Sequence, residues 1–267
     1  MSSLVARNRP PRSGRGLEAG AAVSLETDTP AALREVAAAL AAVRSDAPDF
    51  VTLHYGSGRS AAQLCRQASE SFGSGALHGA SSCLGVMTAR GMAGGSGDAV
   101  GAFAIWDPDG AYGSAMVELD GQPRAAAAEA TRKALARAGR PGEAPDLVWL
   151  SASPGHEEFI LEGIKDVIGR PALIVGASAA DNEVAGNWSV FSSDGVSGAA
   201  VVVSVLFPSV PFGCAFESGY APTGLRGRVT AAEGRRLLRI DDRPRTSTVR
   251  GRFWTVGLSP GRCFQWD

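Results

Sequence analysis

The feature that most constrains this chain is a short signature, Gly-Ala-Ser, which occurs twice at the end of an apolar run. It is found at Gly79–Ser81 and again, 97 positions later, at Gly176–Ser178. The same spacing relates Asp49–Leu53 to Asp146–Leu150. An apolar run that ends in small and polar residues is typical of a buried strand that leads into a loop. Two matches at one spacing predict that the chain contains one structural unit twice.

Secondary-structure signals around the two copies have the same order: strand, helix, Gly-Ala-Ser strand, loop and hairpin. The first unit spans about residues 49–120, with a hairpin that turns at Asp107–Gly110. The second spans about residues 146–207, with a hairpin around Ser193–Ser197. Strands that alternate with helices predict an α/β fold. We expect two similar strand-helix-strand-hairpin units that form mixed sheets with outer helices, in a four-layer packing.

The ends of the chain differ from its middle. Residues 1–18 are rich in Arg, Ser, Gly and Pro and lack periodicity, which predicts a disordered basic N-terminus. Residues 19–244 are expected to fold as one domain, and residues 245–267 form a tail without a clear period. The apolar fraction of 45% and the charged fraction of 20% are those of a folded protein.

Composition also excludes several classes of protein. No apolar run approaches the roughly 18 residues that would span a bilayer, and no signal-peptide segment follows the N-terminal arginines. We therefore expect a cytoplasmic protein without a membrane partner. The four cysteines form no CxxC pair and the three histidines are scattered, so no metal and no cofactor are expected. Basic ends on an acidic body do not make a nucleic-acid surface.

Several segments, taken in their order and spacing, resemble the FIST (F-box and intracellular signal transduction) N-terminal domain over about residues 20–244. The segments are Leu77–Val86, Leu173–Asn182, Asp194–Val201, Gly219–Gly224, Val229-Thr230 and Ile240–Pro244. The resemblance implies a ligand-sensing domain of signalling proteins that binds small molecules such as amino acids, and it implies no enzyme activity. It also implies a following C-terminal FIST domain, which is apparently missing. The tail is then a native end, a truncation or an altered reading frame.

Polar and small residues follow both Gly-Ala-Ser strands, and they are the candidate ligand-binding residues. In α/β folds, ligands gather beyond the carboxyl ends of strands. An aspartate with neighbouring hydroxyl and amide groups would suit the ammonium and polar groups of an amino acid. The alternative is that these residues only build the loop turns. The candidates are Gly79, Ser81, Ser82, Cys83, Gly176, Ser178, Asp181 and Asn182.

Two other function classes stay open beside the non-catalytic sensor. A hydrolase or transferase would use Cys83, with His54 or His78 as its base, or Ser178 in a partial nucleophile elbow. No histidine follows Ser178, although the hydrolase triad order requires one. A protein-binding adaptor would use the basic residues 225–267 or an exposed sheet edge. The sensor hypothesis implies a small-molecule ligand and a signalling protein as partners.

Overall fold

The computed structural model describes residues 16–73, 75–88, 91–95, 98–169, 172–215 and 226–244. The chain divides into two units, residues 1–212 and residues 213–267. The second unit contains, in its described part, a small antiparallel sheet of β13 (Val229–Glu233), β14 (Arg236–Ile240) and β15 (Arg243–Pro244). Most of the predicted disordered N-terminus and the whole tail 245–267 lie outside the described residues, so both stay predictions.

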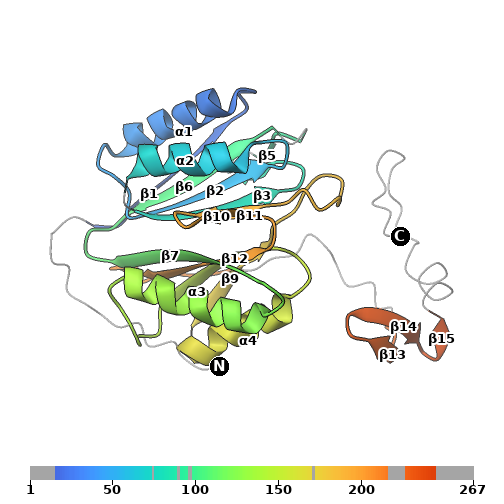
Figure 1. The fold of residues 1–267 in the computed structure, drawn as a ribbon. Coiled ribbons are helices and arrows are strands. Elements are labelled where there is room, and N and C mark those ends of the chain that lie inside the picture. The colour runs from blue at the N-terminus through green and yellow to red at the C-terminus, as the bar shows by residue number, and fades with distance from the viewer. Residues whose placement is uncertain are drawn as a thin grey trace. The chain divides into compact units, whose positions relative to one another are not determined.

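Two mixed sheets form the centre of the first unit (Figure 1). The larger sheet has the spatial order β1 (Glu18–Ser24), β6 (Val100–Trp106), β2 (Phe50–Gly56), β3 (Ala76–Ser82), β10 (Val190–Ser192), β11 (Gly195–Ser197). The smaller sheet has the order β7 (Ala111–Glu118), β12 (Ala200–Phe207), β8 (Leu147–Ala152), β9 (Leu173–Ser178). A separate short hairpin joins β4 (Val86–Thr88) and β5 (Gly91–Ala93).

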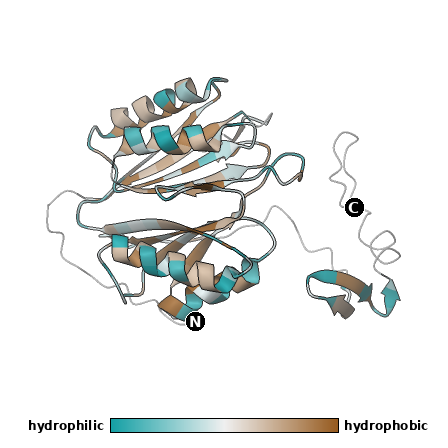
Figure 2. Ribbon diagram, in the orientation of Figure 1, coloured by the Kyte–Doolittle hydropathy of each residue, from teal (hydrophilic) through white to brown (hydrophobic). Residues whose placement is uncertain are grey.

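The helices of this unit lie on the outer sides of the sheets (Figure 1). Helices α1 (Thr29–Val43) and α2 (Ala61–Phe72) bury apolar side chains against the larger sheet. Helices α3 (Pro123–Arg137) and α4 (Glu157–Ile168) do the same against the smaller sheet. Figure 2 shows that the strands are mostly hydrophobic, whereas the helices carry hydrophilic stretches. The predicted class, an α/β fold with mixed sheets and outer helices, is confirmed.

Helix α3 is rich in alanine because its neighbours approach it closely. A Cβ atom on Gly113 of β7 would lie 2.2 Å from the carbonyl oxygen of Ala134 in α3. A Cβ atom on Gly163 of α4 would lie 2.1 Å from the carbonyl oxygen of Arg124, at the start of α3. Both contacts are with backbone, which cannot swing aside. Small residues on all three elements therefore set the distance between the sheet and its helices.

The parallel strand pairs β2–β3 and β8–β9 share one register. Leu53 pairs with Gly79 in the first, and Leu150 pairs with Gly176 in the second, so the spacing of 97 holds across both pairs. The connecting helices α2 and α4 each bury an apolar residue at their fourth position, Leu64 and Ile160, which are 96 residues apart. The internal repeat itself stays a prediction that these shared registers favour.

Both predicted hairpins are wrong. The turn after β6 forms, with the Gly110 N–H donating to the Asp107 carbonyl oxygen at 2.9 Å, but it carries the chain from the larger sheet to the smaller one. Likewise, β10 pairs with β11 and β3, whereas β12 pairs with β7 and β8 in the other sheet. Turn residues specify a local reversal and do not specify the partner strand. Burial decides the partner, since every residue of β12 is buried.

One polar group, His78, bridges the two sheets inside an otherwise apolar interface. Its Nδ1 lies 2.8 Å from the Ser204 hydroxyl and its Nε2 lies 2.8 Å from the Ser151 hydroxyl. The Ser204 hydroxyl is in turn 2.6 Å from the Ser114 hydroxyl. Complete burial, and secondarily the neighbouring His54, lowers the pKa of His78 to about 3. The ring is therefore neutral at pH 7, with one nitrogen donating and the other accepting.

A second link between the sheets is the carboxylate of Asp194, in the turn between β10 and β11. It accepts a hydrogen bond from the Met116 N–H of β7 at 2.8 Å and forms an ion pair with Arg137 of α3. Partial burial acts to raise the pKa of Asp194, but Arg137 and the other donors outweigh it and lower the pKa to about 2. The β10–β11 turn is thereby tied to the smaller sheet and its helix.

We expect acid to destabilise the first unit through His78. The folded-state pKa of about 3 lies below the ordinary value of 6.5, so the unfolded chain binds the extra proton. The free energy of unfolding should therefore fall by up to about 1.4 kcal/mol per pH unit as pH drops from 6.5 toward 3, in addition to other groups. Urea unfolding at pH 7.5 and pH 4.5 measures this loss. In His78→Asn the loss should be smaller, and an equal loss would contradict the assignment.

Candidate functional site

A cavity of about 370 Å³ lies between the two sheets, where β3 and β9 end. The ends of both Gly-Ala-Ser strands meet in it, although they belong to different sheets. We call this the inter-sheet cavity. It is lined by His54, Ala80, Ser81, Ser82, Cys83, Trp149, Leu150, Ser151, Gly176, Ala177, Ser178 and Ala180.

Five of the eight candidate residues line the inter-sheet cavity: Ser81, Ser82, Cys83, Gly176 and Ser178. The other three are not among its lining residues. The structure therefore brings the two predicted loops together. Within these loops, five of the candidate residues line the cavity and three do not.

The three remaining candidates make contacts within the fold. A Cβ atom on Gly79 would lie 2.3 Å from the ring of Phe191, so this glycine makes room for an aromatic side chain. The Asn182 side-chain oxygen accepts from the Leu84 N–H at 2.6 Å, which joins the two loops. The Asp181 carboxylate is 3% exposed and accepts from three backbone N–H groups of its own loop.

These N–H donors also fix the charge of Asp181. Burial acts to raise the pKa of this carboxyl, but the hydrogen bonds from the backbone of residues 183–187 outweigh it and lower the pKa. The carboxylate is thus charged at neutral pH and is held by its own loop. The sequence predicts an ammonium contact at Asp181, but both carboxylate oxygens already accept hydrogen bonds from the loop backbone.

Two serine hydroxyls of the cavity already donate their hydrogens within the fold. Ser82 donates to the Gly85 carbonyl oxygen at 2.7 Å, and Ser178 donates to the Glu157 carboxylate at 2.6 Å. A hydroxyl has one hydrogen to donate and two lone pairs that accept. Because both hydrogens are used, Ser82 and Ser178 offer acceptors to a ligand.

Sequence reasoning about the site missed Trp149 and Ser151, and it considered His54 only as a base for Cys83. His54 and Ser151 stand at the same position of β2 and β8, 97 residues apart, so the repeat spacing itself was the signal that could have found them. The His54 Nε2 lies 3.2 Å from the Thr52 hydroxyl, and its ring is 6.4 Å from that of Trp149. Burial lowers the pKa of His54, so the imidazole is neutral at pH 7.

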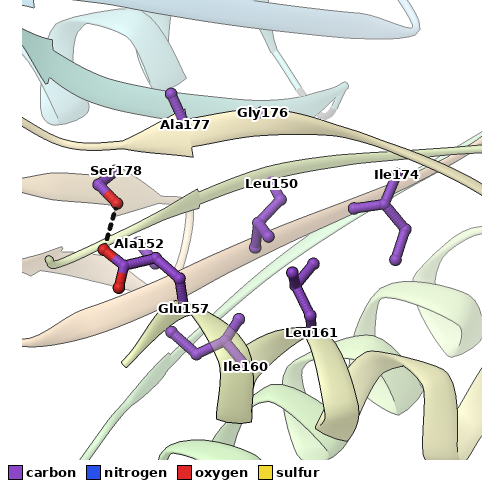
Figure 3. Close-up of a pocket in the computed structure, with 9 residues that line it drawn as sticks. All are labelled: Leu150, Ala152, Glu157, Ile160, Leu161, Ile174, Gly176, Ala177 and Ser178. Atoms are coloured by element: carbon purple, nitrogen blue, oxygen red, sulfur yellow. Dashed lines mark hydrogen bonds between the residues drawn. The ribbon is translucent and has the colours of Figure 1, made fainter. Parts of the chain in front are cut away.

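A second hollow, of about 240 Å³, lies on the other side of β9, against α4 (Figure 3). We call it the α4 hollow. Figure 3 shows apolar side chains from β8, β9 and α4 around it, with the Ser178–Glu157 hydrogen bond at one end. Gly176, Ala177 and Ser178 line both hollows. The apolar lining residues are Leu150, Ala152, Ile160, Leu161 and Ile174.

The hydrogen bonds bear on the two candidate nucleophiles. The imidazole contacts given above join His54 to Thr52 and His78 to two serines, and none of them reaches Cys83. Ser178 contacts a carboxylate rather than an imidazole. The described residues contain no group of three or more His, Cys, Asp or Glu side chains that could hold a metal ion. No helix in the described part of the chain has the length and apolarity needed to cross a membrane.

Two comparisons with known proteins found matches. The chain matches the FIST N domain family over residues 49–243. Among solved structures, it is similar to a cyanuric acid hydrolase from A. caulinodans, with 15% identity, a TM-score of 0.39, and coverage of 71% of this chain and 67% of that chain. No curated protein matches. Because the family match spans more than half of the chain and includes both Gly-Ala-Ser strands, this chain belongs to the FIST N domain family of signal-transduction sensory modules.

Proposed function

We propose that this domain is a non-catalytic sensor that binds a small polar molecule, such as an amino acid, in the inter-sheet cavity. One observation carries the proposal: the carboxyl ends of β3 and β9 deliver Ser81–Cys83 and Gly176–Ser178 to the same cavity. Ligands of α/β proteins gather at such strand ends. The cytoplasmic location stays a prediction from the sequence.

The size and lining of the cavity support a small ligand with hydrogen-bond donors. A volume of about 370 Å³ is at the small end of ligand pockets, which run from roughly 300 to 1,000 Å³. Ser82 and Ser178 offer acceptors, and an ammonium group carries three donors. Trp149 adds an apolar wall. These features suit a molecule of the size of an amino acid.

His54 supplies the complementary contact for an anionic group. Its imidazole is neutral because burial lowers its pKa. A carboxylate placed beside the ring would favour the protonated form and raise that pKa again. A bound amino acid would then direct its ammonium to the serines and its carboxylate to His54, and its binding would be linked to proton uptake.

A thermal-shift screen with the twenty amino acids and related metabolites tests this function. A ligand that binds only the folded state raises the melting temperature, by the equivalent of about 2.7 kcal/mol at a concentration of 100 times its Kd. We expect one or a few amino acids to give a shift, and the double variant Ser82→Ala/Ser178→Ala to lose most of it. Ser69→Ala, on the exposed side of α2, is the matched control. No shift on folded protein would refute the proposal.

Cys83 reports on the same cavity. It lines the cavity, whereas Cys214 is exposed elsewhere in the chain. A ligand identified in the screen should slow the alkylation of Cys83 by N-ethylmaleimide at least several-fold and leave Cys214 unchanged. Mass spectrometry of the digested protein measures both rates in one sample. Unchanged alkylation of Cys83 at saturating ligand would place the ligand elsewhere.

The alternative, a hydrolase that uses Ser178, is favoured by one observation: its hydroxyl donates to the Glu157 carboxylate at 2.6 Å. A carboxylate in that place would act as general base. The sensor proposal instead expects no stoichiometric labelling of the protein by a fluorophosphonate, measured by intact mass. Labelling that Ser178→Ala abolishes and Ser69→Ala retains would favour the hydrolase. A transferase that uses Cys83 stays a prediction.

The adaptor alternative uses an exposed sheet edge or residues 225–267, most of which lie outside the described residues. The described part of that region is the small sheet of β13, β14 and β15. The adaptor and its signalling protein partner stay predictions.

A further inference from the structure

Two chain segments meet beside the inter-sheet cavity. One is the turn of residues 82–85, which follows β3, and the other is the loop of residues 181–187, which follows β9. A backbone hydrogen bond joins the two chains where the segments begin, since the Ala180 N–H donates to the Ser81 carbonyl oxygen at 3.1 Å. Ser81 and Ala180 both line the cavity, so the turn and the loop continue directly from its wall.

Leu84 adopts an unfavourable backbone conformation in the turn. Its φ is +58°, in the left-handed region that the Cβ atom of an L-residue makes costly. Its side chain is 38% exposed, so it is not fixed by a position in the core. Its N–H donates to the side-chain oxygen of Asn182, in the loop, at 2.6 Å. Such conformations persist where neighbouring contacts hold them, and they gather at switch regions. The hydrogen bond to Asn182 is a contact of this kind.

The loop is the fixed side of this contact. The Asp181 carboxylate accepts hydrogen bonds from the N–H groups of Glu183, Ala185 and Asn187, at 2.9, 3.0 and 2.7 Å. Asn182 follows Asp181 directly, so its side-chain oxygen is presented by a part of the chain that these three bonds brace.

The two ends of the turn are also fixed, which leaves its centre as the movable part. Ser82 pairs with Gly56 of β2. At the other end, a Cβ atom on Gly85 would lie 2.0 Å from the carbonyl oxygen of Ala93, so the backbone of the turn packs against that of β5. Between these ends lies the peptide unit that joins Cys83 to Leu84.

Rotation of this peptide unit would have two opposite effects on the energy. It would turn the Leu84 N–H away from Asn182, which breaks one hydrogen bond. It would also bring the φ of Leu84 to an ordinary negative value, which relieves the left-handed conformation. Because the loss and the relief are of the same order, the two orientations of the peptide unit lie close in free energy.

We propose that the Cys83–Leu84 peptide unit is a conformational switch, latched by Asn182, that links the inter-sheet cavity to the protein surface. Cys83 lines the cavity and the next residue, Leu84, is exposed. Rotation of the unit that joins them changes the cavity wall and the surface together. The switch regulates the site proposed above and rests on that function for its ligand.

A ligand controls the switch through the cavity wall. A molecule that contacts the wall at Cys83 binds the latched and the released orientations with unequal affinity, and therefore shifts their populations. By linkage, release of the latch changes the affinity for the ligand by the same factor. The signal leaves the cavity as a change of the exposed backbone at Leu84.

The φ of Leu84 is measured by NMR in the full chain without any ligand. A positive φ brings the amide and α protons of one residue close together and gives a strong intraresidue NOE. In protein labelled with 15N-leucine, the signal of Leu84 is the one that Leu84→Asn removes. We expect a strong NOE in the unsubstituted chain and the loss of at least half of its intensity in Asn182→Ala. Asn182→Asp should retain the NOE, because its carboxylate still accepts from the Leu84 N–H.

Two controls separate the switch from damage to the loop. Asn187→Ala changes an exposed asparagine of the same loop and should keep the NOE. In Asn182→Ala, the amides of Glu183 and Ala185 should stay protected from hydrogen exchange, because Asp181 still accepts from them. A Leu84 NOE of full strength in Asn182→Ala would overturn the proposal. Loss of protection at both amides would do so too, because it would assign the change to unfolding of the loop.

The alkylation rate of Cys83 reports the cavity side of the switch. With N-ethylmaleimide and no ligand, we expect this rate to change at least threefold in Asn182→Ala. It should return toward the original rate in Asn182→Ala/Leu84→Asn, since asparagine tolerates the left-handed region and removes the strain that favours release. Cys214, alkylated in the same sample, should not change. An unchanged rate at Cys83 would show that the cavity wall is not coupled to the turn, contrary to the proposal.

A ligand found in the thermal-shift screen completes the test. It should change the intensity of the Leu84 NOE in the unsubstituted chain, and its Kd for Asn182→Ala should differ at least threefold from its Kd for the unsubstituted chain. An unchanged NOE and equal Kd values would refute the link to the ligand. If the screen finds no ligand, the NOE and alkylation results on the variants still decide the switch, so this proposal and the proposed function fail on different measurements.

Discussion

His78 holds the two sheets together through hydrogen bonds to Ser151 and Ser204, at the centre of an apolar interface. A buried imidazole is tolerated only when both ring nitrogens have partners, because an unpaired polar group costs several kcal/mol in such a place. The two serines come from the smaller sheet and His78 from the larger one. The network therefore permits one alignment of the sheets and disfavours displaced ones.

The position of the inter-sheet cavity follows from that alignment. Ser151 is both a partner of His78 and a residue of the cavity wall, so the polar network extends to the edge of the cavity. The low pKa of His78 keeps the ring neutral, which suits a structural bridge better than a general base. A ligand that contacts Ser151 would affect the hydrogen bond between Ser151 and His78, which joins the two sheets. Ligand binding would then change the stability of the fold.

The strands β3 and β9 have the same local sequence, Gly-Ala-Ser, but different surroundings. Both finish in Gly-Ala-Ser, and both deliver their last residues to the inter-sheet cavity. Gly79 is covered by Phe191, whereas Gly176 is exposed on an open edge. The difference arises because β10 continues the larger sheet and no described strand continues the smaller one.

The sequence by itself determined the local elements and the spacing of the two units. Apolar runs, turn residues and the repeated Gly-Ala-Ser signature predicted the α/β class and five of the residues that line the cavity, among them Ser82 and Ser178. These signals are local, since each depends on neighbours within a few positions. Only the tertiary structure decided the strand partners, the burial of Asp181 within its own loop, and the meeting of His54 with Trp149. Those features depend on which faces bury together, and contacts between residues far apart in the chain leave no local pattern to read.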